Sequence, residues 1–201
     1  MRKELSLEEF LKRNRIDNTE WDAANIEWET LQEIATDHIN ASANLEKSAE
    51  FIAKVIQKFN DVHSVRWRVK NPEHLLAKII RKRVEGNEKY ADISVYNYFE
   101  KITDLVGVRA LHLFKDDCFG IDKGIRAEWN IQDPPLAYIR EGDSEALRNK
   151  FSEAGFEVRN HDAGYRSVHY LVESTPLKRK IMVKSKICCK FASLGSLTFR
   201  S

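Results

Sequence analysis

A seven-residue repeat in the first third of the chain constrains the fold more than any other feature of the sequence. Mostly apolar residues recur between residues 21 and 61 at two interleaved sets of positions: Trp21, Trp28, Ala35, Ser42, Ala49 and Ile56, and Ala24, Leu31, His38, Leu45, Ile52 and Phe59. Such spacing is typical of one apolar face on a long helix. The repeat weakens at Ala35, His38 and Ser42, so it predicts either one helix or two helices broken near residues 40–44. It favours a helix that packs on its own domain over a dimeric coiled coil, and the oligomeric state stays open.

The remaining patterns alternate strands with helices. Residues 105–114 form an apolar run that predicts a buried central strand. The pair Asn71 and Pro72 supplies a cap and a first-turn proline, which predicts a helix over residues 72–84. Further helices are expected at residues 6–13, 96–101, 116–129 and 143–154, and further strands at 63–70, 136–140, 156–160 and 166–173. Residues 180–183 allow one more strand, whereas residues 184–201 show no clear helical or strand period.

Composition excludes several classes of protein. The 201 residues carry a formal net charge of +2 and are 42% hydrophobic, which is typical of one globular domain and gives no overall reason to expect nucleic acid or membrane as a partner. There is no apolar run long enough to span a bilayer and no signal-peptide pattern, so a cytoplasmic protein is expected. Cys118, Cys188 and Cys189 form neither a disulfide framework nor a zinc-binding spacing, which fits a reducing compartment.

One predicted strand has an unusual polar and aromatic face. Residues 164–170 read GYRSVHY, and alternation places Tyr165, Ser167 and His169 on the same side. A phenol ring, a hydroxyl and an imidazole can stack on a purine and form hydrogen bonds with it, and Gly164 allows the backbone to come close to a ligand. The pattern therefore indicates a purine-binding surface, although an ordinary edge strand with a solvated face fits it equally well.

Charged residues near two other strands suggest phosphate chemistry. Asp104 stands at the entrance of the apolar run and is either a ligand for the magnesium ion of a nucleotide or a turn residue. Arg109 interrupts the same run, so it is expected to pair with an internal acid or to contact a ligand. Arg66, Arg68 and Lys70 share one strand face, where they could meet phosphates or simply face solvent.

Other catalytic motifs are missing or incomplete. His161 and Asp162 form the dipeptide found in metal-dependent phosphohydrolases, but no further histidines and acids follow at helical spacing. No phosphate-binding loop with a Gly-Lys-Ser/Thr end and no Gly-x-Gly-x-x-Gly occurs, and Ser167 lacks the glycine-flanked elbow of serine hydrolases. These classes of enzyme are therefore disfavoured.

Taken together, three segments resemble the synthetase domain of the RelA/SpoT alarmone family, enzymes that transfer pyrophosphate from ATP to the 3′ hydroxyl of GDP or GTP. The resemblance rests on RVKNPEHLLAK at residues 68–78, DLVGVR at 104–109 and GYRSVHY at 164–170, in the family's order. It covers about residues 50–183 and implies an α+β fold, with a nucleotidyltransferase-like mixed β-sheet flanked by helices and a long helical N-terminal segment. The corresponding division is a helical segment at 1–62, an incomplete synthetase domain at 63–183 and an atypical basic tail at 184–201.

The resemblance also implies roles for individual residues on the ATP side of the site. Arg68 and Arg109 would hold the adenine of ATP between them. Asp104 would be the catalytic carboxylate and would bind Mg²⁺. Lys70 and Lys78 would add positive charge along the path of the phosphates.

On the acceptor side, Tyr165 would stack on the guanine of GDP or GTP and His169 would contact a phosphate. The chain then departs from the family, whose next strand reads Glu-x-Gln-x-Arg-Thr and supplies a glutamate that binds magnesium or activates the 3′ hydroxyl. Here Val183 is followed by Lys184, so a lysine stands where the glutamate is expected, and residues 174–201 contain no acid at all. A shifted reading frame or a degenerate end would leave such a tail, and sequencing the gene around the codon for Val183 tests this hypothesis.

The sequence thus leaves three hypotheses for function. The first is synthesis of guanosine tetraphosphate or pentaphosphate, impaired by the missing glutamate. The second is a non-catalytic protein of the same family that binds guanine nucleotides. The third is an interaction protein built on the long N-terminal helix.

Overall fold

The computed structural model describes residues 6–114, 116–131, 133–161, 164–174 and 181–189. Helices and strands follow each other as α1 (Leu7–Asn14), α2 (Asn18–Ala24), α3 (Trp28–Gln57), β1 (Val62–Val69), α4 (Pro72–Val84), the 3₁₀ helix η1 (Glu88–Tyr90), α5 (Tyr98–Lys101), β2 (Val106–His112), α6 (Asp117–Glu128), β3 (Leu136–Ile139), α7 (Glu145–Glu153), β4 (Glu157–Asn160), β5 (Ser167–Ser174) and β6 (Ile181–Cys189). The expected α+β fold with a long N-terminal helix is confirmed. None of the described helices is long and apolar enough to cross a membrane.

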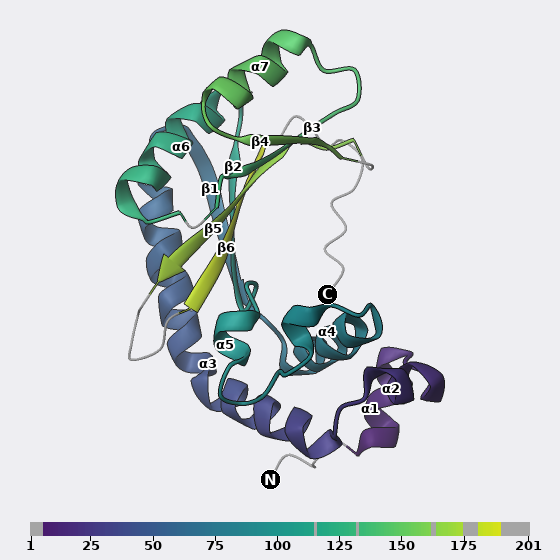
Figure 1. Cartoon of the computed structure of the whole chain (residues 1–201). Helices are drawn as coiled ribbons and strands as arrows, with labels where there is room; N and C mark the ends of the chain where they lie inside the picture. Colours follow the sequence, from purple (N-terminus) through teal and green to yellow (C-terminus); the bar gives the residue numbers. More distant parts are fainter. Residues whose placement is uncertain (1–5, 115, 132, 162–163, 175–180, 190–201) are drawn as a thin grey trace.

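The strands form one mixed six-stranded sheet in the order β1-β2-β6-β5-β3-β4. β2 and β6 run parallel, as do β3 and β4, while the other neighbours are antiparallel. Helix α3 runs along the sheet, with α4 and α5 near one end of α3 and α6 and α7 near the other (Figure 1). The sheet thus has one face packed on α3, and the two groups of helices lie apart.

The N-terminal helices differ from the expectation in where they break. Helix α3 is continuous through residues 40–44, so the alternative with a break there is wrong, and the other alternative, one helix from residue 21 onward, is correct only from Trp28, because the chain turns between α2 and α3. Asn25 ends α2 in the left-handed conformation at φ 46°, and Asp17 and Glu20 form a capping box at its start. Ser42 does not interrupt α3, because its hydroxyl donates to the carbonyl oxygen of Ile39 within the helix.

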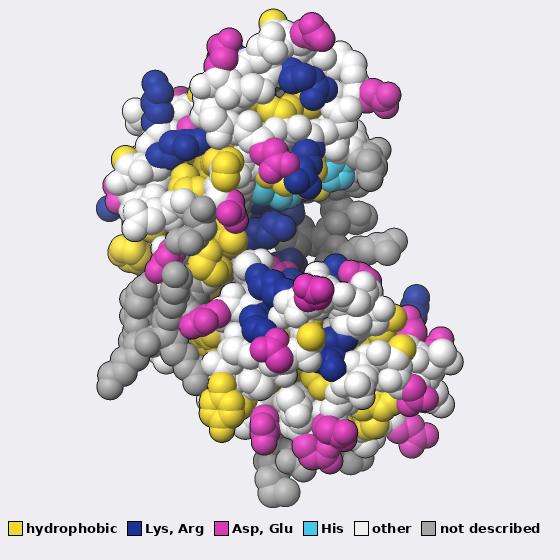
Figure 2. All heavy atoms as spheres, viewed as in Figure 1, with side chains coloured by type: hydrophobic (Ala, Val, Ile, Leu, Met, Phe, Trp, Pro, Cys, Tyr) yellow, Lys and Arg dark blue, Asp and Glu magenta, His cyan; other side chains and the backbone are white. Residues whose placement is uncertain are grey.

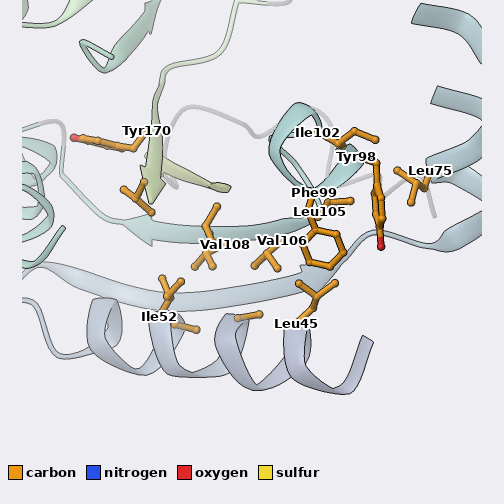
Figure 3. Close-up of a cluster of buried hydrophobic side chains, with 14 of the residues drawn as sticks. Leu45, Ile52, Leu75, Tyr98, Phe99, Ile102, Leu105, Val106, Val108 and Tyr170 are labelled. Carbon is orange, nitrogen blue, oxygen red and sulfur yellow. The ribbon is translucent and has the colours of Figure 1, made fainter. Parts of the chain in front are cut away.

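The core lies between α3 and the strands β1 and β2. Figure 3 shows Val106 and Val108 on the same side of β2 as Leu45 and Ile52 of α3. Leu45, Ile52, Val106 and Val108 are all buried. Gly107 and Arg109 alternate with these valines, so they lie on the opposite face of the sheet.

The polar residue that weakens the repeat in α3 has a structural explanation. His38 is fully buried, and its Nε2 atom lies 2.7 Å from the carbonyl oxygen of Lys70. Burial lowers the pKa of His38, because desolvation outweighs the hydrogen bond to Lys70 and the charge of Asp37. The neutral imidazole is therefore bonded to the backbone of Lys70, the residue that follows β1.

The most important correction concerns β6. No regular structure was expected from residue 184 onward, yet β6 extends to Cys189 and lies between β2 and β5. Val183, Ser185 and Ile187 are buried on one face of this strand, and Lys184 and Lys186 alternate with them. The rest of the expected basic tail, residues 190–201, lies outside the described residues.

Candidate functional site

A cavity of about 470 Å³ opens on the face of the sheet that carries Gly107 and Arg109. Lysine and arginine side chains gather in a hollow of the molecular surface, and histidine lies at its rim (Figure 2). Within the described part of the chain, the charged residues that line the cavity are Arg66, Arg68, Arg109, Lys184, Lys186 and Asp104. Five cations against one carboxylate make this a site for an anionic ligand.

The register of the strands explains how these cations come together. Arg66 of β1 lies opposite Arg109 of β2, and Arg109 lies opposite Lys186 of β6. Lys186 in turn lies opposite His169 of β5. Like charges directly opposite each other on neighbouring strands are destabilising. A bound anion would remove this repulsion, so the row of cations indicates a binding surface rather than a structural element.

Arg109 is not buried, in contrast to the expectation from its apolar neighbours. Its side chain is exposed to the cavity, because none of the described helices covers this face of β2 as α3 covers the other. The planar guanidinium groups of Arg109 and Arg68 both border the cavity, from adjacent strands. This position allows contact with a phosphate or with a planar base.

Asp104 lies just before β2 and is held by two lysines. One carboxylate oxygen accepts a hydrogen bond from Lys78 Nζ of α4 at 2.5 Å, and the other accepts one from Lys70 Nζ at 3.0 Å. Burial alone would raise the pKa of Asp104, but the hydrogen bonds and charges of Lys78 and Lys70 outweigh it and lower the pKa below its usual value. Asp104 is therefore an ionised carboxylate whose two oxygens are both engaged.

Tyr165 lies at the edge of the cavity, just before β5. The centroid of its ring is 3.5 Å from that of His161, and Lys186 Nζ lies 4.1 Å from the ring centroid. The ammonium group over the ring is a cation–π contact. A base that stacks on Tyr165 must therefore share the ring with His161 and Lys186.

His169 is a neutral imidazole in this environment. Burial lowers its pKa to about 3, and the positive charges of Lys186, Lys184, His161 and Arg109 act in the same direction. Its Nε2 atom lies 3.1 Å from the hydroxyl of Ser167, and its ring packs against Tyr138 at 4.9 Å between centroids. His169 can therefore offer a hydrogen bond to a ligand, but not a positive charge.

The low pKa of His169 predicts a dependence of stability on pH. Between about pH 6.5 and pH 3 the unfolded chain binds a proton at this imidazole that the folded chain does not, so the free energy of unfolding falls as the pH is lowered. His169→Gln should make this fall shallower. Urea denaturation at a series of pH values measures it, with His63→Gln at an exposed position of β1 as the control. Equal slopes for the wild type and His169→Gln would contradict the assignment.

The structure brings together most of the residues singled out from the sequence. Arg68, Asp104, Arg109, Tyr165 and His169 all line the cavity, although they come from three separate segments. Lys70 and Lys78 donate hydrogen bonds to Asp104 but do not line the cavity themselves. The individual roles of these seven residues stay predictions.

Two lysines that line the cavity were not among the predicted site residues, although Lys184 was noted at the position where the family's glutamate is expected. Lys184 and Lys186 line the cavity from β6. Partial removal from water lowers the pKa of Lys184, an effect that nearby Asp104 opposes and that Lys78, Lys186 and Lys70 reinforce. Their alternation with Val183, Ser185 and Ile187 was a usable signal of a strand.

The described residues do not by themselves form a magnesium site, and a role of Asp104 in binding Mg²⁺ together with a nucleotide stays a prediction. They contain no group of three or more histidines, cysteines or acids that could hold a metal ion. Asp104 is the only described carboxylate that lines the cavity, and both its oxygens accept hydrogen bonds from lysines. Mg²⁺ needs free oxygen ligands, and five nearby cations oppose its entry.

The sequence of the chain matches one protein family. The model of that family, described as a region found in RelA / SpoT proteins, matches residues 67–193. The match covers more than half of the chain and includes the last residues of β1 and the whole of β2, β5 and β6, strands that line the cavity. The chain belongs to the RelA/SpoT family. The match also includes Lys184 and Lys186, so this RelA/SpoT chain carries its two unexpected lysines inside the family region.

Several solved structures are similar to this RelA/SpoT chain. Small alarmone synthetase 1 from Bacillus subtilis is 18% identical over 72% of this chain and 66% of that one, with a TM-score of 0.45. The same protein bound to its product pppGpp gives 17% identity over 72% and 63%, with a TM-score of 0.43. A GTP pyrophosphokinase family protein from Streptococcus pneumoniae gives 22% over 81% and 70%, with a TM-score of 0.45. The chain thus spans slightly less than two thirds of the first of these proteins. No curated protein matches.

Proposed function

We propose that this chain binds ATP together with GDP or GTP in the cavity, and that it transfers pyrophosphate from ATP to the 3′ hydroxyl of the guanine nucleotide only at a greatly reduced rate. The observation that carries the proposal is the convergence of three distant segments on one cavity: Arg68 from β1, Asp104 and Arg109 around β2, and Tyr165 and His169 around β5. Membership of the RelA/SpoT family supports the same reaction class.

The chemistry of the lining agrees with nucleotide binding. Arginine side chains can hold phosphates through paired hydrogen bonds or stack on a base, and Arg68 and Arg109 stand on neighbouring strands of the cavity. Tyr165 offers an aromatic ring at the rim, and His169 offers a neutral N–H group. A polyphosphate would also relieve the repulsion between Arg66, Arg109 and Lys186.

The reduced rate follows from what surrounds the acceptor site. Attack by a ribose hydroxyl needs a group that takes its proton, and general bases of this kind contribute about 10²- to 10⁴-fold to rates. The carboxylate of Asp104 is engaged by Lys70 and Lys78, and Lys184 stands where the family resemblance implies a glutamate. This arrangement favours a second candidate function, namely nucleotide binding without turnover.

Two measurements separate these functions. Incubation of the purified chain with labelled ATP, GDP or GTP and magnesium detects product, and calorimetry detects nucleotide binding. Slow product formation supports the enzyme, binding without product supports the second candidate, and absence of both contradicts the proposal.

The tyrosine at the rim provides a test of where the nucleotide binds. Tyr165→Ala should weaken the binding of GDP or GTP by about tenfold, because the stacking of one base on an aromatic ring contributes about 1–3 kcal/mol. Calorimetric titration measures the dissociation constant. The matched control is Tyr96→Ala, since Tyr96 is 94% exposed and does not line the cavity. The placement of the base is wrong if both variants bind guanine nucleotide as the wild type does.

A further inference from the structure

The two lysines of β6 are fixed at the centre of the sheet. Lys184 lies between Gly107 of β2 and Leu171 of β5, and Lys186 lies between Arg109 and His169. Their neighbours on β6, Val183, Ser185 and Ile187, are buried on the other face. Because β6 is paired on both sides, the lysine stems start from a rigid backbone and reach the cavity as parts of its wall.

Gly107 lies between two of the cations. In the sheet it is flanked by Arg68 and Lys184, and it carries no side chain. Neighbouring strands are about 4.8 Å apart, so the backbones of Arg68 and Lys184 lie roughly 10 Å apart. The side chain of Arg68 lies over the glycine, because a Cβ atom at Gly107 would be 3.8 Å from the Cγ and Nε atoms of Arg68. The absence of a side chain at Gly107 thus lets Arg68 lean from β1 across β2, toward the strand that carries Lys184.

The lysines also determine which form of a nucleotide fits. A free triphosphate carries more negative charge than its magnesium complex. Asp104 is already engaged by Lys70 and Lys78, so it offers little compensation for the positive charge of Lys184 and Lys186, which line the same cavity. Like charges in a partly desolvated site repel each other and a divalent cation alike.

We propose that the cavity binds the polyphosphate of a nucleotide as the free anion, without a divalent metal, and that Lys184 and Lys186 provide the charge neutralisation that a metal ion would otherwise supply. This inference rests on the proposed function, because it assumes that the cavity binds nucleotides at all. Lys186 already lies over the ring of Tyr165, at 4.1 Å from its centroid. A nucleotide whose base contacts Tyr165 therefore lies beside Lys186, in the cavity that Lys184 also lines.

The test compares binding with and without metal. ATP and GTP are titrated into the full chain by calorimetry, once in EDTA and once with excess Mg²⁺ at matched ionic strength. We expect binding in EDTA to be at least about tenfold tighter, since each charge-assisted hydrogen bond contributes about one order of magnitude to affinity. Inorganic triphosphate should compete with both nucleotides in EDTA.

Variants in which an uncharged glutamine replaces each lysine test whether Lys184 and Lys186 cause the tighter binding in EDTA. Lys184→Gln and Lys186→Gln should each weaken binding in EDTA about tenfold and reduce the difference between the two conditions. The matched control is Lys54→Gln on α3, where the lysine side chain is 72% exposed and pairs with Glu50. Thermal unfolding of all three variants shows that they fold as the wild type does.

The outcomes distinguish this inference from the proposed function. Binding that is equal in the two conditions, or tighter with Mg²⁺, overturns the metal-free mode but leaves nucleotide binding intact. Tight binding in EDTA that both glutamine variants retain overturns the role of the lysines. Absence of nucleotide binding in either condition overturns the proposed function itself.

Discussion

Lys184→Glu is expected to raise the rate of pyrophosphate transfer by about 100-fold or more. The substitution places a carboxylate on the central strand β6, in a cavity whose other described carboxylate is engaged by two lysines. A carboxylate at this position can accept the proton of the attacking 3′ hydroxyl, which an ammonium group cannot do. The same change removes a cation, so we expect the affinity for free ATP and GTP to fall.

The measurement is product formation from labelled ATP with GDP or GTP as the acceptor. Lys184→Gln is the matched control, because it removes the positive charge without supplying a base. If the two variants form product at the same rate, proton transfer at this position does not limit the reaction. In that case the lysine at position 184 is not the cause of the reduced rate that we propose.

The largest effect on stability is expected for Asp122→Ala, at about 2–3 kcal/mol. Asp122 of α6 is 6% exposed and accepts hydrogen bonds from the hydroxyl of Tyr170 and from Nε of Arg126, each at 2.9 Å. Burial raises the pKa of Tyr170, and the negative charge of Asp122 raises it further, so the phenol stays protonated and donates. Removing Asp122 leaves a buried hydroxyl and a guanidinium group without this acceptor.

Urea denaturation of the variant and the wild type measures this loss. The control is Asp116→Ala, next to α6, where the ion pair with Lys150 is exposed and contributes about 1 kcal/mol or less. Tyr170→Phe removes only one of the two hydrogen bonds and should lie between the two. A loss for Asp122→Ala no larger than that for Asp116→Ala would contradict the importance of this buried cluster.

Local signals were sufficient to predict most of the elements. The helix α4 spans the residues predicted from its cap, because Asn71 accepts hydrogen bonds from the backbone N–H groups of Glu73 and His74. The break between α2 and α3 was misplaced, since it depends on the left-handed conformation of Asn25 and not on the weak part of the repeat. The apolar repeat is weak at His38 because this buried histidine bonds to the backbone carbonyl of Lys70, which is distant in sequence.

The candidate site was predicted in part, for a similar reason. Motifs in three segments identified Arg68, Asp104 and Arg109 together with Tyr165 and His169, but Lys184 and Lys186 were taken for a tail. The strand β6, which carries both lysines, is stabilised by pairing with β2 and β5. This pairing depends on distant segments, so it cannot be predicted from the residues of β6 alone. The exposure of Arg109 was missed because an apolar run does not reveal that one face of a sheet is open to a cavity.

A crystal structure of the chain with ATP or GTP in EDTA tests the central claim most directly. We predict density for the triphosphate between Arg68 and Arg109 on one side and Lys184 and Lys186 on the other, with the purine near Tyr165. Density for the nucleotide elsewhere on the molecule, with this cavity empty at saturating ligand, would contradict the account.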